Sequence, residues 1–145
     1  MSTTRTPAKP ADSHNREVRR LATLLDTSQA LTGTLDLKAG LHRVLEILGR
    51  HHGAVRSTVA LLEEDTGQLQ VEASDGLDRP GYRVSYQLGE GITGRVVESG
   101  KPIVVPQISR EPMFLNRASK RSELPQQELS FLCVPIVLNR KAVGA

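Results

Sequence analysis

Residues 89–94 read Gly-Glu-Gly-Ile-Thr-Gly, the G-x-G-x-x-G spacing that lets a backbone approach the pyrophosphate of a dinucleotide. That chemistry requires a buried parallel strand before the glycines and a long crossover helix after them. The preceding run, 83–88, instead alternates polar and apolar residues, which indicates a half-exposed antiparallel strand. The following helix can extend only over 93–99, because Gly100 and Pro102 end it. The context therefore favours a glycine turn between a strand and a short helix.

Two roles remain open for these glycines. They can serve the tight turn alone, since glycine accepts a positive φ without steric cost. Alternatively, the amides of Ile92–Gly94 can face a small anion at the start of the helix.

The strongest candidate for ligand binding is the irregular, polar stretch 106–129. Loops of this length within a domain often act as lids or binding loops. An arginine in such a loop could hold a carboxylate through two parallel hydrogen bonds. The candidate ligand contacts combine apolar and polar side chains of this loop with one aromatic residue from each of two strands: Tyr86, Met113, Phe114, Asn116, Arg117, Arg121 and Phe131. The alternatives are a solvated basic loop and a surface that meets a regulatory protein.

Other reactive side chains indicate neither catalysis nor a metal site. The one cysteine, Cys133, lies in a strongly apolar run, which is typical of a buried core thiol. His51 and His52 are adjacent on a predicted helix, so their side chains point about 100° apart and cannot easily chelate one ion. The acidic run 63–65 falls in a predicted turn, and no companion His/Asp pattern points to a nucleophile. The sequence therefore predicts a protein that is not an enzyme.

Composition restricts the class further. A chain of 145 residues fits one domain, and with 3% aromatic residues its core must be aliphatic. A single cysteine fits a reducing compartment, and no apolar run approaches the length of a membrane span, so a cytoplasmic location is expected.

The net charge of +3 resides in residues 1–20, which hold five basic and two acidic residues. A short basic leader is more typical of a solvated tail than of a nucleic-acid interface.

Hydrophobic periodicity predicts an α+β fold. Residues 1–15 are expected to be a disordered basic leader, and residues 16–145 to form one folded domain. Two amphipathic helices come first, the second with Asp36 as its N-cap and Gly53 as its end. Strands are predicted at 57–62, 69–73, 83–88, 103–105 and 130–138, with a half-strand at 142–145. We expect an antiparallel sheet with the two helices on one face and a ligand cavity on the other. The half-strand predicts an unpaired edge and a domain that is incomplete at its C-terminal end.

The order of these elements, the run 88–97 (Leu-Gly-Glu-Gly-Ile-Thr-Gly-Arg-Val-Val) and the strand Ser130–Ile136 resemble a GAF domain. The block 103–117 (Ile-Val-Val-Pro-Gln-Ile-Ser-Arg-Glu-Pro-Met-Phe-Leu-Asn-Arg) is more specific. It resembles the amino-terminal sensor of the NifA family, bacterial transcriptional activators of nitrogen-fixation genes. The resemblance covers about residues 17–145. The relatives that activate alternative nitrogenases carry amino-terminal cysteine clusters, so a chain with no cysteine before Cys133 favours the NifA branch.

The resemblance implies a regulatory role. In that family the sensor restrains a downstream AAA+ ATPase, which remodels RNA polymerase carrying sigma-54, while a helix-turn-helix domain binds DNA. It suggests 2-oxoglutarate as a candidate effector and a PII-type or anti-activator protein as a candidate partner. It also implies a homodimer or higher oligomer, for which the first helix is a reasonable contact.

Other functions remain open. The chain could be the GAF sensor of a histidine kinase or of a cyclic-dinucleotide enzyme, or a protein-docking module without a small ligand. The pattern of cyclic-nucleotide GAF domains is incomplete, because Arg117 replaces its lysine and Pro135-Ile136 stands in place of its acidic pair. Cyclic-nucleotide binding is therefore not expected.

Overall fold

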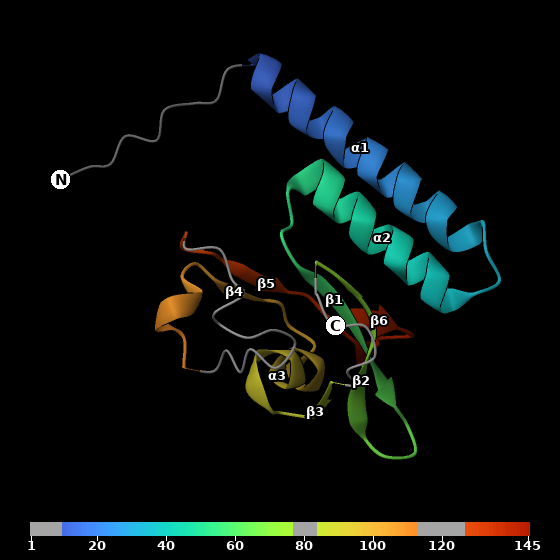
Figure 1. Ribbon diagram of the computed structural model, residues 1–145, viewed down its shortest axis with the longest axis vertical. Helices are drawn as coiled ribbons and strands as arrows, with labels where there is room; N and C mark the ends of the chain where they lie inside the picture. Colours follow the sequence, from blue (N-terminus) through green and yellow to red (C-terminus); the bar gives the residue numbers. More distant parts are fainter. Residues whose placement is uncertain (1–9, 77–83, 113–126) are drawn as a thin grey trace. The chain divides into compact units, whose positions relative to one another are not determined.

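The computed structural model describes residues 10–76, 84–112 and 127–145, and the chain divides into two units, Met1–Val55 and Arg56–Ala145. The first unit is a helical hairpin made of α1 (Pro10–Thr32) and α2 (Leu37–His52), as Figure 1 shows. The second unit holds the strands and the short helix α3 (Gly91–Ser99). The predicted packing of the helices on one face of the sheet stays a prediction.

Local capping explains the bounds of the hairpin. Asp36 accepts hydrogen bonds from the amides of Lys38 and Ala39, at 3.0 and 3.2 Å, and so caps α2. Gly53 ends α2 in the left-handed conformation, with φ of 68°. Both caps confirm the sequence prediction.

The start of α1 differs from the sequence prediction, because residues 10–15, predicted to be disordered, form the first turns of the helix.

Two features of the sequence favour this early start. Proline is tolerated in the first turn, where its missing N–H has no helical partner. Asp12 lies in the same turn, where a negative charge interacts favourably with the helix dipole. The remainder of the predicted leader, residues 1–9, lies outside the described residues.

The second unit contains an antiparallel five-stranded sheet, in the order β3-β2-β1-β7-β6. Its strands are β1 (Ser57–Glu63), β2 (Gln68–Asp75), β3 (Ser85–Gln87), β6 (Ile136–Leu138) and β7 (Lys141–Gly144). A separate antiparallel pair joins β4 (Ile103–Val105) to β5 (Phe131–Cys133). These pairings, with the helices, confirm the predicted α+β class.

The predicted strand 130–138 is two strands in the structure. Cys133 ends β5 and Ile136 begins β6, with Val134 and Pro135 between them. Proline has no N–H to donate, so it interrupts the ladder of strand hydrogen bonds. As a result β5 pairs with β4, while β6 pairs with β7.

The predicted unpaired edge at the last strand is wrong. Strand β7 lies between β1 and β6 and pairs with both. Ala60 and Ala145 exchange two backbone hydrogen bonds of 2.9 Å, which extend the β1–β7 pairing. The tight turn at Asn139 and Arg140 returns the chain beside β6, and in the antiparallel order of the sheet the returning strand β7 also lies against β1.

That turn supplies a stability prediction. Asn139 and Arg140 have φ of 50° and 64°, the left-handed pair that a two-residue hairpin turn requires. Glycine adopts this conformation without the steric cost that arginine carries. The substitution Arg140→Gly should therefore raise the free energy of unfolding by about 1 kcal/mol. Urea denaturation of the two chains checks it, and an unchanged or lower midpoint would contradict it.

Helix α3 (Gly91–Ser99) packs against β3, β5 and β7. It ends at Gly100, whose φ is 65°, as the sequence predicts. Two neighbouring residues of α3 enter different hydrophobic clusters. Val96 packs with Val105 and Cys133, whereas Val97 packs with Ala60 and Leu69. The helix therefore links the β4–β5 pair to the larger sheet.

Candidate ligand-sensing site

The glycine motif forms the turn between β3 and α3. Gly89 and Gly91 have φ of 77° and 60°, a conformation that favours glycine. A Cβ on Gly94 would overlap the carbonyl oxygen of Gln87. The amide of Gly94 donates to the carbonyl oxygen of Glu90 at 2.9 Å, so it is already used within the chain. The geometry favours the turn over an anion site.

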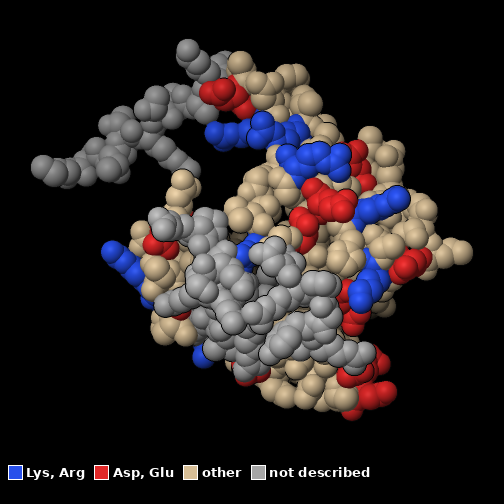
Figure 2. Space-filling model, in the orientation of Figure 1, with Lys and Arg blue, Asp and Glu red and all other residues tan. Residues whose placement is uncertain are grey.

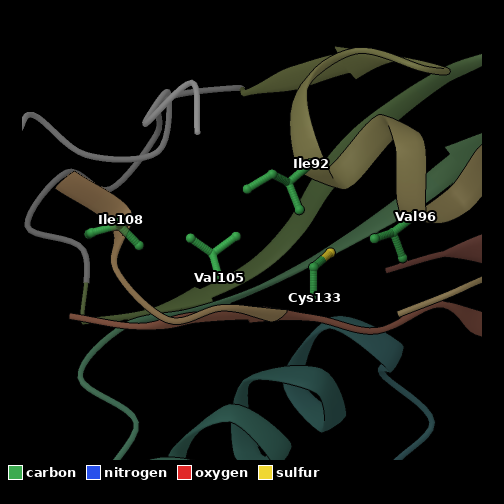
Figure 3. Packing of buried hydrophobic residues seen from close by; sticks show 5 residues of the cluster. All are labelled: Ile92, Val96, Val105, Ile108 and Cys133. Atoms are coloured by element: carbon green, nitrogen blue, oxygen red, sulfur yellow. The ribbon is translucent and has the colours of Figure 1, made fainter. Parts of the chain in front are cut away.

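Beyond the turn, an apolar cluster joins α3 to the β4–β5 pair and to the short helix η1 (Ile108–Arg110). Figure 3 shows its side chains converging from these elements: Ile92, Val96, Val105, Ile108 and Cys133. Each is at most 8% exposed. The cluster is entirely aliphatic apart from the thiol, as the small number of aromatic residues predicts.

The cluster holds Cys133 as a protonated thiol. Burial raises the pKa of Cys133 to about 11, and a hydrogen bond with the Thr93 side chain offsets part of that rise. A nucleophilic or metal-binding cysteine needs a lowered pKa. The buried-core interpretation of Cys133 is therefore confirmed by its surroundings.

The raised pKa of Cys133 predicts a pH dependence of stability. An unfolded thiol ionises near its ordinary value of 9.0, whereas the folded thiol keeps its proton until about pH 11. Unfolding then releases a proton between these values, so the folded state loses about 2 kcal/mol as the pH rises from 9 to 11. We expect Cys133→Ala to lose less stability than the parent chain across this window, as measured by urea denaturation. Equal losses in the two chains would contradict the assignment.

A polar clasp joins the two sides of the predicted binding loop. The Ser109 hydroxyl and amide donate to the two carboxylate oxygens of Glu128, at 2.7 and 3.2 Å. Next to them, the Ile108 amide donates to the Leu129 carbonyl oxygen at 3.0 Å. The Ser109 hydrogen bonds hold the pKa of Glu128 below its ordinary value. The residues that flank 113–126 are therefore held together at η1.

Sequence reasoning did not identify Ser109 or Glu128. They are separated by 19 positions, and no pattern links Ser109, within the block 103–117, to Glu128. An exposed serine and an exposed glutamate in an irregular stretch carry no pairing signal, so only the folded chain reveals the clasp.

The predicted ligand contacts divide into two groups. Five of them lie outside the described residues: Met113, Phe114, Asn116, Arg117 and Arg121. Of the other two, Tyr86 packs against the cluster of Ala60, Leu69 and Val97, whereas Phe131 packs against the cluster that contains Cys133. The structure thus places Tyr86 and Phe131 in different clusters. Their contact with a ligand stays a prediction.

The two adjacent histidines have separate partners within the helical hairpin. His51 Nε2 lies 3.0 Å from Asp26 Oδ2, and His52 Nε2 lies 2.9 Å from Thr23 Oγ1. Both contacts join α2 to α1. Among the described residues, no three His, Cys, Asp or Glu side chains lie together in a way that could hold a metal ion.

Figure 2 shows acidic side chains next to basic ones among the described residues. A nucleic-acid interface ordinarily concentrates cations on one contact surface. Within the described ranges, no helix is long and apolar enough to cross a bilayer.

Known proteins resemble this chain in sequence and in fold. A family model described as the GAF domain matches residues 34–145. The Nitrogen fixation protein VnfA of Azotobacter vinelandii is 42% identical over 127 residues, which are 86% of this chain and 24% of that protein. The Nif-specific regulatory protein of Herbaspirillum seropedicae is 36% identical over 125 residues, 86% of this chain and 23% of that protein. This chain therefore spans about a quarter of the length of these relatives, and the identities do not decide between their branches.

Solved structures agree with this similarity. The nlh2 GAF domain of A. Aeolicus in an inactive state superposes with a TM-score of 0.78 at 25% identity, covering 88% of this chain and 76% of that one. The free methionine-R-sulfoxide reductase of Neisseria meningitidis superposes with a TM-score of 0.65 at 18% identity, covering 99% and 77%. The second likeness concerns the fold alone, and it shows that this fold also occurs in enzymes.

Proposed function

This chain belongs to the GAF domain family, and we propose that it is the regulatory sensor domain of a sigma-54-dependent activator of nitrogen-fixation genes. The observation that carries the proposal is its similarity, over most of its length, to several nitrogen-fixation regulators. The ATPase and DNA-binding activities belong to the whole regulator. The part assigned to this chain is the control of those activities.

Control requires two arrangements of the domain whose populations a signal can shift. Helix α3 is suited to this task because Val96 and Val97 belong to different hydrophobic clusters. A movement at η1 or β4 would change the packing of Val96, and α3 would transmit the change toward the larger sheet. Binding that favours one arrangement would then restore or release the restraint on a downstream AAA+ ATPase.

We further propose a small carboxylate as the signal, with 2-oxoglutarate as the first candidate. Arg117 and Arg121 are the groups assigned to its carboxylates, since guanidinium binds carboxylate through paired hydrogen bonds. The Ser109–Glu128 clasp supports this assignment, because it fixes both sides of the segment that contains these arginines.

Isothermal titration calorimetry of the 145-residue chain with 2-oxoglutarate tests the ligand. We expect saturable binding that the charge reversals Arg117→Glu and Arg121→Glu abolish, with Lys101→Glu, an exposed site before β4, as the matched control. Unchanged binding in the reversed chains would refute the arginine assignment. An absence of binding in the parent chain would refute 2-oxoglutarate as the signal.

The second candidate function is a protein-docking module. The loop that carries Arg117 and Arg121 would then meet an anti-activator or a PII-type protein, and no small ligand would bind. A pull-down of purified PII protein by the parent chain, lost in the same charge-reversed variants, would favour this function. The sensor of a histidine kinase or of a cyclic-dinucleotide enzyme has less support, because the matched regulators are nitrogen-fixation proteins.

The proposed domain performs no chemistry of its own. Cys133 is its single cysteine, and the raised pKa of this thiol opposes nucleophilic or redox activity at neutral pH. We also propose that the domain acts in the cytoplasm, where a DNA-binding regulator must work.

A further inference from the structure

The helical hairpin carries a groove between α1 and α2, within the first unit. Its cavity volume is about 350 Å³, at the lower end of the range for small-molecule sites. The floor is apolar and consists of Ala30 and Ile47, each 6% exposed. Four charged side chains form the rim: Asp26, Arg43, Glu46 and Arg50. We call these six residues the hairpin groove.

The charges on the rim balance, since two carboxylates stand against two guanidinium groups. The Asp26 carboxylate already has a partner, because His51 Nε2 lies 3.0 Å from its Oδ2 atom. In the part of the chain that the structure describes, Arg43, Glu46 and Arg50 take part in no ion pair. These three charged groups are therefore available to a ligand of opposite charge.

The helical spacing of α2 places both signs of charge side by side. Glu46 follows Arg43 by three residues and precedes Arg50 by four, so the three side chains are neighbours on one side of α2. A carboxylate acceptor and a guanidinium donor thus stand next to each other at the rim. The α-carbon of a free amino acid carries the complementary pair, an ammonium group beside a carboxylate.

Helix α1 adds a polar, uncharged side chain, that of Gln29, to the lining of the groove. The two helices are antiparallel, and Asp26 contacts His51 near the C-terminal end of α2 (Figure 1). Gln29 follows Asp26 along α1, so it lies closer to Arg43 than Asp26 does. Its amide N–H can donate to a carboxylate that Arg43 also holds.

Other classes of ligand fit this set of charges less well. A dianion would meet the carboxylates of Asp26 and Glu46, and a dication would meet the two arginines, so each would face like charges. An uncharged apolar molecule would displace water from the rim without replacing its hydrogen bonds. A zwitterion satisfies both signs of charge, and a small aliphatic side chain matches the apolar floor.

We propose that the hairpin groove is a binding site for a zwitterionic α-amino acid with a small aliphatic side chain. Arg43 and Gln29 donate to its carboxylate, and Glu46 accepts from its ammonium group. The aliphatic side chain rests on Ala30 and Ile47. The site consists of α1 and α2 residues alone, so it does not depend on the loop arginines assigned to the carboxylate signal.

An NMR titration of the nitrogen-labelled 145-residue chain with L-valine, followed through the backbone amide signals, tests this proposal. We expect saturable shifts of amides in α1 and α2 with a Kd of about 0.1–1 mM, in keeping with the small size of the ligand. Isovalerate lacks the ammonium group of valine, and isobutylamine lacks its carboxylate. Each analogue should bind at least roughly tenfold more weakly than valine.

Substitutions at the rim test the residue assignments. Glu46→Gln and Arg43→Gln remove one charge each and keep good helix formers, so both should weaken valine binding at least roughly fivefold. The matched control is Arg20→Gln, at an exposed arginine of α1 outside the groove, which should bind valine as the parent chain does. All three side chains are exposed, so the variants should melt in circular dichroism as the parent chain does.

Three results would overturn the proposal. The first is an absence of valine binding to the parent chain up to about 20 mM, a measurement that depends on no variant. The second is isovalerate that binds as tightly as valine, which would make the groove a site for anions. The third is binding that shifts only amides of the second unit, or that neither rim substitution weakens. None of these results bears on the proposed sensor function, which is tested through Arg117 and Arg121.

Discussion

Replacement of Gly94 by alanine is expected to lower the free energy of unfolding by about 3 kcal/mol or more. The new Cβ would overlap the carbonyl oxygen of Gln87 and would lie 3.0 Å from the amide nitrogen of Gly89. Both neighbours are backbone atoms of the β3–α3 turn, so no flexible side chain can move aside. Alanine is otherwise the better helix former by about 1 kcal/mol, so a loss of stability isolates the effect of the overlap.

The matched control for this substitution is Arg95→Ala. Arg95 is the next residue of α3 and is exposed, so its truncation should change stability by no more than about 0.5 kcal/mol. Urea denaturation of both variants measures the difference. A Gly94→Ala chain as stable as the control would mean that the turn can open, and that the third glycine serves a purpose other than close backbone approach.

Truncation of Leu69 to alanine is expected to cost about 3 kcal/mol. Leu69 is fully buried in β2, where it packs with Ala60 and Val97. The substitution removes apolar contacts and leaves a cavity between Ala60 and Val97, which the surrounding side chains cannot easily fill. This loss should appear in the thermal midpoint and in the urea midpoint of the second unit.

Leu132→Ala is the corresponding control for a strand leucine. Its side chain is 64% exposed in β5, so its truncation should change stability by less than about 1 kcal/mol. Equal losses from the two substitutions would show that the cluster around Leu69 does not dominate the stability of this unit.

Local signals account for the part of the fold that the sequence predicts. The caps Asp36, Gly53 and Gly100 depend on residue type and on short-range hydrogen bonds, and each lies where it was expected. The strand-like runs 57–62 and 69–73, separated by a turn at 63–67, likewise predict a hairpin, which the register of β1 and β2 confirms.

The errors concern long-range pairing. Pro135 divides one apolar run between two strand pairs, and periodicity alone cannot assign each half to its neighbour. The last strand also pairs on both sides, which follows from the turn at Asn139 and Arg140 and from the distant strand β1.

The candidate site is less predictable than the fold. Tyr86 and Phe131, which the sequence predicts to contact one ligand, pack against different hydrophobic clusters. The Ser109–Glu128 clasp depends on two exposed residues brought together by the fold. By contrast, the context of the glycine motif favoured a turn over a dinucleotide site, because the strand before it alternates as an antiparallel strand does and the helix after it is short.

Transcription from a nitrogen-fixation promoter tests the central claim most directly. The corresponding segment of the Herbaspirillum seropedicae regulator would be replaced by this chain, and reporter output compared in nitrogen-rich and nitrogen-poor cells. We predict that output depends on nitrogen status. At equal protein levels, Gly94→Ala should make output independent of nitrogen status, whereas Arg95→Ala should not. Output that stays the same in both conditions, and that neither substitution changes, would contradict a sensor role for this chain.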